Sequence, residues 1–549
     1  MRSLPVASRC RSMSKQRDAK PFRTIDCETD PFKEGRVPRP FIWGCYDGQT
    51  GDYWEFDDAA GLIAHLREYK GIVYAHNGGR FDFHYLRDFI NSDQVMMVIS
   101  GRLAKFKIGE CEFRDSMNIL VNPLRAFAKD EIDYAKLEED VREQNMPEIK
   151  KYLRSDCVNL WETIAKYFAS YGRSLTQAGS AMKYWKRVYE FPFTPQTAIQ
   201  AERCREFYYG GRVECFKTGH GVGDFKVVDI NSAYPRGMKE KHPISPNSIL
   251  MEHLPAAGDF GRCFMKLLAV ADGCFPFREE DGKLSFPNDG KPREYSVTGW
   301  ELEAALELNL CRIIRVIDVR RFTQTVDFVD YVDHFYAERK RAKAAGDKAA
   351  DVFAKLFLNS LYGKFAADPE KYHEYVISHP EDCVKWLLKD YIDTGPWGER
   401  RLLVRKLPEQ RHHYYNVATA ASITGWVRSY LMRGIAACEG VLYCDTDSIA
   451  ARDISRLPLG PELGQWKLEL TGTEYAIAAK KTYAFKSVDG TWKTASKGVK
   501  LTPEEIVRCA KGETIRHAPI VPTYSIFRPT PEFVTRAIRR TESGLHVMQ

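Results

Sequence analysis

The segment Val441–Ala450 (VLYCDTDSIA) has two apolar runs with acidic residues between them. Apolar residues lead into Asp445-Thr446-Asp447, and the apolar pair Ile449-Ala450 follows, a pattern that predicts a strand, a tight turn and a second strand. Residues two apart on a strand point to the same side, so we expect Asp445 and Asp447 to present their carboxylates together. Such a pair suits Mg²⁺, which prefers hard oxygen ligands. Taken alone, however, the segment is better explained as a solvated acidic turn.

A second acidic strand end lies far upstream, in Lys226–Pro235 (KVVDINSAYP). The β-branched pair Val227-Val228 predicts a strand that delivers Asp229 to its end, and Tyr234-Pro235 predicts a turn away from it. Asp229 and Asp447, from separate strands, could together hold two divalent metal ions. One ion would activate an attacking hydroxyl, and the other would bind a triphosphate.

A predicted helix, Ala354–Phe365 (AKLFLNSLYGKF), lies between these two segments. Lys355, Asn359 and Tyr362 fall on one face of it. A lysine and a tyrosine on that face could neutralise a triphosphate and stack on a base. An ordinary amphipathic helix explains the same pattern equally well.

In this order and at these separations, the three segments resemble motifs A, B and C of the family B DNA polymerases. The wording KLFLNSLYGKF and YCDTDS is similar to that of the protein-primed branch. The stretches ETDPF, YAHNGGRFDF, NVATAASITG and ASKG are most similar to polymerases of tectiviruses, bacteriophages whose linear DNA is capped by terminal proteins. The resemblance implies a right-hand fold of palm, fingers and thumb. It also implies template-directed DNA synthesis with two divalent ions per active site, Mg²⁺ with Mn²⁺ as a usable substitute.

Three segments nearer the N-terminus also carry carboxylates: Thr24–Asp30 (TIDCETD), Gly71–Phe83 (GIVYAHNGGRFDF) and Tyr152–Asp156 (YLRSD). The first predicts a strand, and the second predicts a buried strand followed by a helix that begins near Phe81-Asp82. The third opens a predicted helix that runs to about Phe168. Four carboxylates can thus converge from one strand and two helices: Asp26, Glu28, Asp82 and Asp156.

These segments resemble the DxE, Nx₃FD and Yx₃D motifs of proofreading 3′→5′ exonucleases, which have an RNase H-like fold. The resemblance implies that the four carboxylates bind two metal ions and that Tyr152 helps to orient the attacking water. Lys136 matches an assisting lysine of the family, although its surroundings are only loosely motif-like. The implied contacts with a single-stranded 3′ end are Asn77, Phe81, Ser116 and Met117.

The resemblance also implies ligands for the nucleotide and the DNA, with Asp445 supporting the metal-binding pair. From the residues alone, Gly210-Gly211 could equally be a linker turn, and Arg339 with Lys343 could form a solvated basic face. The implied nucleotide ligands are Tyr234 under the incoming sugar, Arg339, Lys343, Lys355, Asn359 and Tyr362. The implied DNA ligands are Tyr208, Gly210, Gly211, Arg428, Lys481, Tyr483 and Lys497.

The expected fold class is α/β and α+β with several domains. Residues 1–22 form a basic tail, which we expect to be disordered. An exonuclease domain (23–190) precedes a polymerase domain (191–549). The expected parts of the second are a palm with motif A (226–235), an insertion within 236–334 and fingers (335–365) that reverse at Ala345-Gly346. A second insertion (366–411), a palm segment with motif C (412–460) and a thumb (467–549) follow. A helix is also predicted over Thr298–Leu308.

Composition is that of a globular protein, with 44% apolar and 28% charged residues. No uninterrupted apolar run approaches ~20 residues, so we expect no membrane span. The 14 cysteines include no C-x-x-C pair, which argues against a zinc site and a disulfide framework and favours a reducing cytoplasm. From Lys467 to Gln549 there are 14 Lys and Arg against 8 Asp and Glu, an excess expected where a segment lies along phosphates.

The expected protein is therefore a monomer in the cytoplasm of a bacterial host. Its expected partners are template and primer DNA, dNTPs and a terminal protein that carries the priming hydroxyl. Such an enzyme would be processive, strand-displacing and proofreading. One alternative is a repair-type polymerase that extends ordinary DNA primers. Another is an inactive nucleic-acid-binding homologue, but every expected carboxylate is present at both sites, which argues against it.

Overall fold

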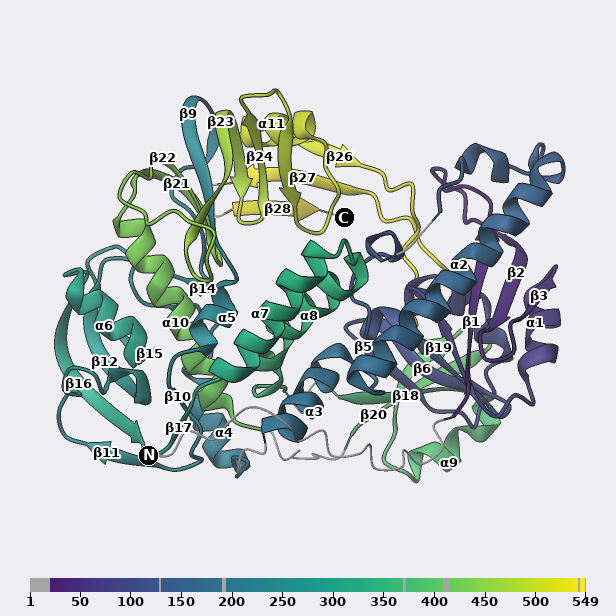
Figure 1. The fold of residues 1–549 in the computed structure, drawn as a ribbon, viewed down its shortest axis with the longest axis horizontal. Helices are drawn as coiled ribbons and strands as arrows, with labels where there is room; N and C mark the ends of the chain where they lie inside the picture. Colours follow the sequence, from purple (N-terminus) through teal and green to yellow (C-terminus); the bar gives the residue numbers. More distant parts are fainter. Residues whose placement is uncertain are drawn as a thin grey trace.

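The computed structural model describes residues 20–127, 130–189, 194–368, 372–407, 415–541 and 544–548. Residues 1–19 of the expected basic tail lie outside these ranges. Figure 1 shows the N-terminal domain at the right, the first insertion at the left, the thumb at the top and two long helices between them. Within the described ranges, no helix has the length and apolar content needed to cross a membrane.

The N-terminal domain is built on a ten-stranded mixed sheet. Strand β1 (Phe22–Thr29) carries Asp26 and Glu28, and it pairs in parallel with β4 (Ile72–Ala75) and antiparallel with β2 (Pro40–Asp47). Helix α2 (Arg142–Tyr171) packs on β1 and β2 and begins well before the predicted segment. The other elements here are β3 (Asp52–Phe56), α1 (Ala59–Leu66), β5 (Met96–Ile99), β6 (Arg102–Ile108), β7 (Cys111–Asp115) and α3 (Gln177–Tyr189).

The helix predicted to begin near Phe81-Asp82 is absent as an α-helix from this described part of the chain. Three short 3₁₀ turns replace it: Gly78–Arg80, Asp82–Tyr85 and Arg87–Phe89. Asn77 adopts the left-handed conformation, with φ +66°. Gly79 passes so close to β6 that a Cβ atom would lie 2.3 Å from the Leu103 carbonyl oxygen. This tight approach prevents a regular helix.

The second insertion extends the sheet of the N-terminal domain. Strand β18 (His373–Ser378) pairs antiparallel with β5, and β20 (Arg400–Lys406) and β19 (Ile392–Trp397) follow outward. The short helix α9 (Cys383–Leu387) belongs to the same insertion. Segments far apart in the sequence therefore share one sheet.

The palm is a seven-stranded sheet in the order β25-β24-β23-β9-β22-β21-β8. Strand β9 (Gly219–Ile230), which delivers Asp229, is longer than the sequence predicts. Residues 467–496, which the sequence assigns to the thumb, belong largely to this sheet. Its other strands are β8 (Val213–Cys215), β21 (Glu439–Asp445), β22 (Ser448–Asp453), β23 (Trp466–Ala479), β24 (Thr482–Ser487) and β25 (Trp492–Ser496). Helices α4 (Ala198–Arg205) and α5 (Ala233–Met238) pack on the helix Val417–Ala436.

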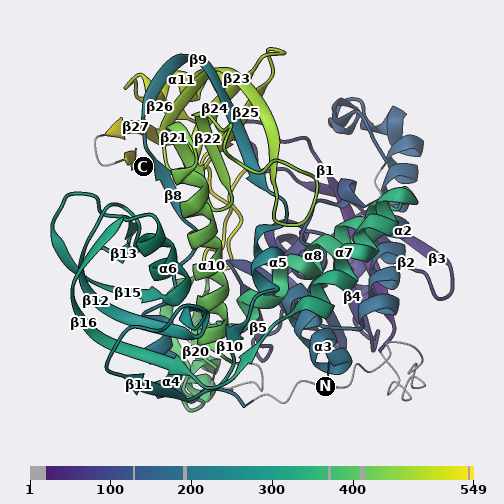
Figure 2. The same cartoon turned by 60° about the vertical axis from the view of Figure 1, so that its left-hand side comes forward.

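Helix α10 (Val417–Ala436) runs between the first insertion and the fingers, as Figure 2 shows. The fingers are α7 (Val329–Ala344) and α8 (Lys348–Lys364), which reverse at Gly346 with φ +70°, as predicted. Left-handed backbone of this kind favours glycine. Helix α7 begins earlier than the predicted Phe335.

The first insertion is a four-stranded antiparallel sheet covered by α6 (Gly299–Glu307). Thr298 and Glu301 form a capping box at the start of α6, which confirms the predicted helix. Its strands are β11 (Ser248–Met251), β12 (Cys263–Ala271), β15 (Pro292–Thr298) and β16 (Cys311–Phe322), with the small pairs β10 (His242–Pro243)/β17 (Thr325–Val326) and β13 (Phe277–Arg278)/β14 (Leu284–Ser285). The thumb contains α11 (Pro503–Ala510), β26 (Ile515–His517), β27 (Arg536–Thr541) and β28 (Gly544–Met548).

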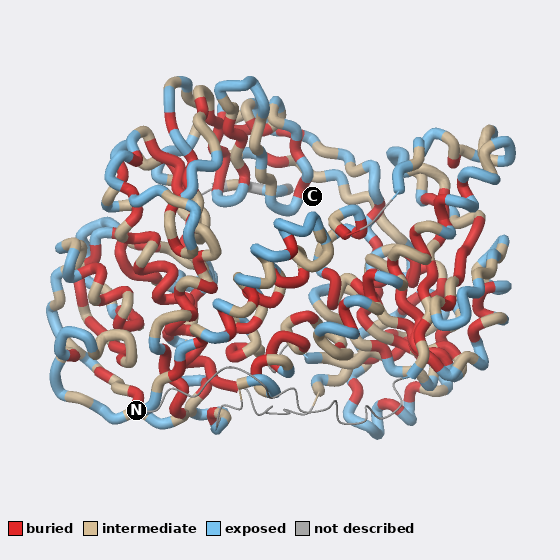
Figure 3. The backbone as a smooth tube through the Cα atoms, in the orientation of Figure 1, coloured by how far each residue is buried: buried red, intermediate tan, exposed pale blue. Residues whose placement is uncertain are grey.

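One large apolar cluster joins the N-terminal domain to the fingers and to α10. The ring of Tyr171 on α2 lies 4.1 Å from that of Phe357 on α8, and Tyr167 lies 5.3 Å from Phe353. Figure 3 shows buried stretches along the two finger helices and in the N-terminal domain beside them. Because burial of aromatic surface is strongly stabilising, this core fixes the fingers against the N-terminal domain.

Candidate functional sites

Asp229 and Asp447 lie on neighbouring chain segments in the palm, as the sequence predicts. β9 and β22 pair antiparallel with Asp229 opposite Ser448, and the Ile230 amide donates to the Asp447 carbonyl at 2.8 Å. Asp447 belongs to the turn itself. Thr446 adopts φ +63°, and the Asp447 amide donates to the Asp445 carbonyl at 2.6 Å, so the acidic turn is tight.

The carboxylates of this palm site resist ionisation because they are partly buried and crowded. Burial, followed by repulsion from Asp447, raises the pKa of Asp229 to about 7. Burial, followed by repulsion from Asp445, raises the pKa of Asp447 to about 6. Glu469 on β23 adds a further negative charge that raises the pKa of both. A divalent cation fits this set, because it would offset the repulsion.

Glu469 was not predicted from the sequence. It is exposed, and its carboxylate forms an ion pair with Lys493. In the sequence, Glu469 is only a single acid within a predicted thumb segment. The pairing of β23 with β9 in the structure places it beside Asp229.

Asp445 is held by the K-x-Y segment that follows motif C. The Lys481 ammonium lies 2.7 and 3.0 Å from its two carboxylate oxygens. The Lys481 amide also donates to the Tyr443 hydroxyl at 2.9 Å, and the ring of Tyr483 lies 4.9 Å from that of Tyr443. Asp445 is thus already charge-compensated, which suits the supporting role predicted for it. Lys497, further along the chain, is exposed.

Gly211 supports the acidic turn from the other side. A Cβ atom at Gly211 would lie 2.7 Å from the Thr446 side chain, whereas one at Gly210 would meet no atom within 4 Å. The Thr446 amide donates to the Arg212 carbonyl at 2.7 Å. Gly211 therefore packs against the acidic turn of the palm site, whereas Gly210 lies in open space.

The prediction that Arg428 contacts DNA is wrong. Its side chain is 1% exposed and forms an ion pair with the equally buried Glu301 at 2.7 Å. Its guanidinium also donates to the carbonyls of Tyr209 and Gly210 at 2.6 and 2.9 Å. Arg428 therefore holds the segment before Gly211 against α10 and α6, and solvent-exposed phosphate has no access to it.

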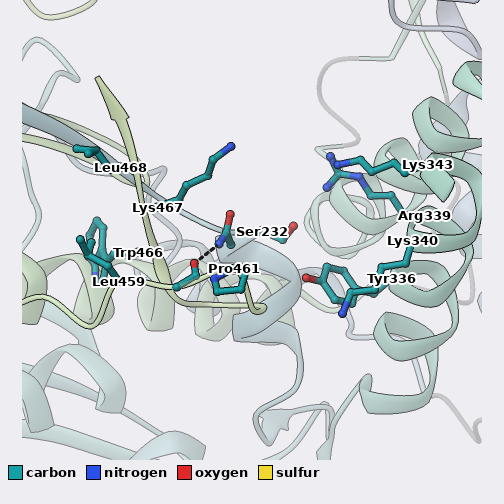
Figure 4. Close-up of a pocket in the computed structure, with 12 residues that line it drawn as sticks. Ser232, Tyr336, Arg339, Lys340, Lys343, Leu459, Pro461, Trp466, Lys467 and Leu468 are labelled. Atoms are coloured by element: carbon teal, nitrogen blue, oxygen red, sulfur yellow. Dashed lines mark hydrogen bonds between the residues drawn. The ribbon is translucent and has the colours of Figure 1, made fainter. Parts of the chain in front are cut away.

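A cavity of about 550 Å³ opens between α7 and the palm (Figure 4). Arg339 and Lys343, two predicted nucleotide ligands, line it together with Lys340 and Tyr336 of the same helix. Lys467 of β23 faces them across the cavity, and this lysine was not predicted. Arg339 is also paired with Asp351 at 2.9 Å. The arrangement gathers cations from two domains where a triphosphate would be neutralised.

Helix α8 places its predicted residues at two depths. Lys355 and Asn359 are exposed, and the Asn359 side-chain amide donates to the Lys355 backbone carbonyl at 2.8 Å. Tyr362 is half-buried and stacks on Tyr234, with ring centroids 4.4 Å apart and planes 4° apart. Tyr208 lies close enough to both rings to influence their ionisation, and burial raises the pKa of all three phenols.

The four carboxylates of the N-terminal domain lie around the end of β1. Glu28, Asp82 and Asp156 are buried and Asp26 is half-buried. The Cys27 thiol donates to Asp82 at 3.2 Å, and burial followed by repulsion from Asp82 and Asp26 raises the pKa of that thiol. Burial, followed by repulsion from Asp26, Asp156 and Glu28, raises the pKa of the Cys157 thiol. No three of these acids form a closed metal-binding cluster within the described ranges.

Tyr152 lies beside these acids on α2 and is buried. Burial, followed by repulsion from Asp156, raises its pKa. Its hydroxyl also interacts with that of Tyr134, a residue not predicted from the sequence. By contrast, Lys136 forms an exposed ion pair with Glu148 at 2.8 Å, and its assisting role stays a prediction.

The predicted single-strand ligands differ in access. The Asn77 side-chain oxygen accepts a hydrogen bond from Arg102 at 2.6 Å, and Arg102 in turn pairs with Asp115 at 3.0 Å. Phe81 and Met117 are half-buried. Ser116 is fully buried, and its hydroxyl lies 2.9 Å from the His76 Nδ1 atom. The prediction that the Ser116 side chain contacts DNA is therefore wrong, because it is enclosed in the domain.

Comparisons with known proteins agree with this geometry. A family model described as DNA polymerase type B, organellar and viral, matches residues 128–399. The chain is 38% identical over 497 residues to the DNA-directed DNA polymerase of Enterobacteria phage PRD1, covering 88% of this chain and 86% of that protein. It is 24% identical over 478 residues to the DNA polymerase of Bacillus phage phi29, covering 79% and 78%.

A solved structure has the same arrangement of domains. The Phi29 DNA polymerase complexed with primer-template DNA and incoming nucleotide substrates matches with a TM-score of 0.73 at 19% identity. The match covers 95% of this chain and all of that one. At this identity the likeness concerns the fold. It confirms the predicted fold class, an exonuclease-type domain followed by palm, fingers and thumb.

Proposed function

Because the chain belongs to the viral type B DNA polymerases and is a DNA-directed DNA polymerase, we propose that it replicates linear phage DNA from a terminal-protein primer and proofreads its product. The observation that carries this proposal is the presence of two carboxylate sites on two separate sheets, one in the palm and one in the N-terminal domain. The enzyme would act as a monomer in the cytoplasm of a bacterial host. A repair-type polymerase that extends only ordinary primers is the alternative.

In the palm, Asp229 and Asp447 would hold two Mg²⁺ ions, for which Mn²⁺ could substitute. These ions would make the attacking hydroxyl more acidic and neutralise the triphosphate. Arg339, Lys343 and Lys467 would bind the phosphates in the cavity between α7 and β23. From the exposed face of α8, Lys355 would offset phosphate charge and Asn359 would line the nascent pair.

The stacked pair Tyr234–Tyr362 would form a flat platform under the incoming sugar and base. A rigid ring at that place disfavours a ribose hydroxyl by steric conflict.

On the DNA side, Tyr208, Gly210 and Gly211 would approach the template strand. Lys481, Tyr483 and Lys497 would contact the primer strand.

In the N-terminal domain, the four carboxylates would bind a second pair of divalent ions, and Tyr152 would orient the attacking water. Asn77, Phe81 and Met117 would contact the frayed 3′ end. A mismatched terminus frays more readily than a paired one, since it has lost base-pairing energy. The N-terminal site would therefore remove errors before synthesis resumes.

The two sites can be separated by mutation. We expect Asp447→Asn to reduce dNTP incorporation on a primed template by about 10³-fold or more, since it removes a metal ligand, and to leave degradation of a single-stranded oligonucleotide within about twofold. Asp26→Ala is expected to do the reverse. Both activities are measured on each variant, with the circular dichroism spectrum and Tm as folding controls. Loss of both activities in either well-folded variant would overturn the two-site proposal.

A further inference from the structure

A strap of residues 518–535 leaves the thumb after β26, crosses to the N-terminal domain and returns to β27. Figure 1 shows this strap in yellow, passing from the thumb at the top to the domain at the right. Such a long connection between two short paired strands is more than the thumb sheet needs, because hairpin loops are usually two to five residues.

The strap is fastened to the N-terminal domain by apolar and polar contacts. Ile526 is 1% exposed and belongs to the apolar core of that domain. The Trp397 indole donates to the Ile526 carbonyl at 2.9 Å, and Arg87 donates to the Arg528 carbonyl at 2.9 Å. Since these bonds use backbone carbonyls of the strap, they fix its path and not only its side chains.

Tyr524 of the strap sits against the exonuclease-type motif. It is 8% exposed, and its ring lies 5.4 Å from that of Phe81, edge to face. Its hydroxyl lies 2.6 Å from that of Tyr85. Tyr85 donates its own proton to the Pro38 carbonyl at 2.6 Å, so Tyr524 is the donor between the two phenols. Burial raises the pKa of Tyr524 to about 12, so this proton is retained.

Phe81 directly precedes Asp82 and has few other ring partners in the described structure. Its ring meets Phe32 and Tyr85 at 5.5 Å each, and Phe32 is itself 40% exposed. The buried Tyr524 and the half-buried Tyr85 are therefore the less exposed rings that hold Phe81 in place. A tightly enclosed neighbour restricts a ring more than an exposed one does, since the exposed one can move aside.

We propose that Tyr524 is a positioning residue of the exonuclease site: it holds the Phe81 ring where the single-stranded 3′ end lies, so the thumb supplies part of the proofreading site. This inference rests on the proposed exonuclease function. It assigns the strap a role in editing in addition to its role as a link between domains.

The test uses the full-length chain and a 5′-labelled single-stranded oligonucleotide. We expect Tyr524→Ala to raise KM for its degradation by about 3- to 10-fold, with kcat changed less than twofold, because Phe81 binds the strand and does not react. Tyr524→Phe keeps the ring and is expected to restore most of the KM. Tyr524→Leu fills most of the space without a flat ring, so it is less prone to misfold than Tyr524→Ala. It is expected to raise KM as Tyr524→Ala does.

The matched control is Val521→Ala, which alters an exposed strap residue and is expected to leave KM unchanged. If the wild-type chain does not degrade the oligonucleotide, the proposed exonuclease function itself fails and this inference fails with it. If the wild type is active and Tyr524→Leu has the same KM as Val521→Ala, the exonuclease stands and the positioning role is refuted. A fall in kcat alone, with KM unchanged, would also refute it.

Discussion

At the scale of single residues, the palm carboxylates make the metal-free protein less stable as the pH rises. The folded-state pKa of Asp229 (about 7) and of Asp447 (about 6) lies above the ordinary aspartate value of 3.8. The stabilisation from keeping these groups protonated is complete below about pH 4 and is lost as the pH rises to about 7. A bound divalent cation would reverse this cost.

We therefore expect Asp229→Asn to raise the Tm of the metal-free protein at about pH 8 by about 1–3 °C, because it removes a crowded, half-exposed charge. At about pH 4.5 the same change is expected to alter Tm little. Excess Mg²⁺ at about pH 8 is expected to stabilise the wild type more than the variant. Differential scanning calorimetry measures each value. A lower Tm for the metal-free variant at high pH would contradict the assigned repulsion.

The control for this experiment is Asp453→Asn at the end of β22. Hydrogen bonds from the Ser455 amide and then the Ser455 hydroxyl lower the pKa of Asp453, so its charge is favourable to folding. Its removal is not expected to raise Tm at any pH. The pair of variants thus separates a specific effect of the palm site from a general effect of net charge.

At the scale of elements, the acidic turn depends on the Gly-Gly segment that packs against it. We expect Gly211→Ala to reduce kcat for dNTP incorporation by about 10-fold or more, because the new methyl group would displace Thr446, and a displacement of about 1 Å at a reacting centre is costly. Gly210→Ala meets open space and is expected to have a much smaller effect. Single-turnover incorporation measures both, and equal effects would show that the turn does not depend on this contact.

At the scale of the whole molecule, two insertions surround the palm and fingers, and the first presents a basic and apolar strand to solvent. Arg312 and Arg315 of β16 are exposed, as are Ile314 (46%) and Ile317 (40%). Exposed apolar residues that lie together can mark a protein-docking surface, and here cations lie beside them. If a terminal protein docks there, its hydroxyl would be held in register with Asp229 and Asp447.

Incubation with a labelled dNTP and the candidate terminal protein encoded beside this gene is expected to give a labelled protein–nucleotide adduct. We expect Arg312→Glu with Arg315→Glu to reduce its formation by about 10-fold while primer extension persists, since reversed charges oppose docking. Lys283→Glu with Lys291→Glu, at two exposed sites of the same insertion, is the matched control. An enzyme that extends DNA primers well but labels no co-encoded protein would favour the ordinary-primer alternative.

Much of this molecule can be predicted from local sequence, since local patterns determine local structure. Apolar runs that end in acids placed Asp229 at the correct strand end and Asp447 in the correct turn. Helical spacing with a glycine reversal predicted α7 and α8. The Thr298–Glu301 capping box marks the start of α6 in the sequence itself. These features depend on residues within a few positions of one another.

Contacts between distant segments decided the rest. The sequence around Arg428 resembles that of a DNA-binding segment. In the structure, however, Arg428 is buried against Glu301 and the carbonyls of Tyr209 and Gly210. Glu469 and Lys467 reach the palm site only because β23 pairs with β9. Strand β18 joins the N-terminal sheet because β5, the edge strand of that sheet, is free to pair with β18. Tyr524 reaches Phe81 only through the path of the strap. Pairing and burial between segments far apart in the chain follow from the packing of the complete fold, which no local pattern encodes.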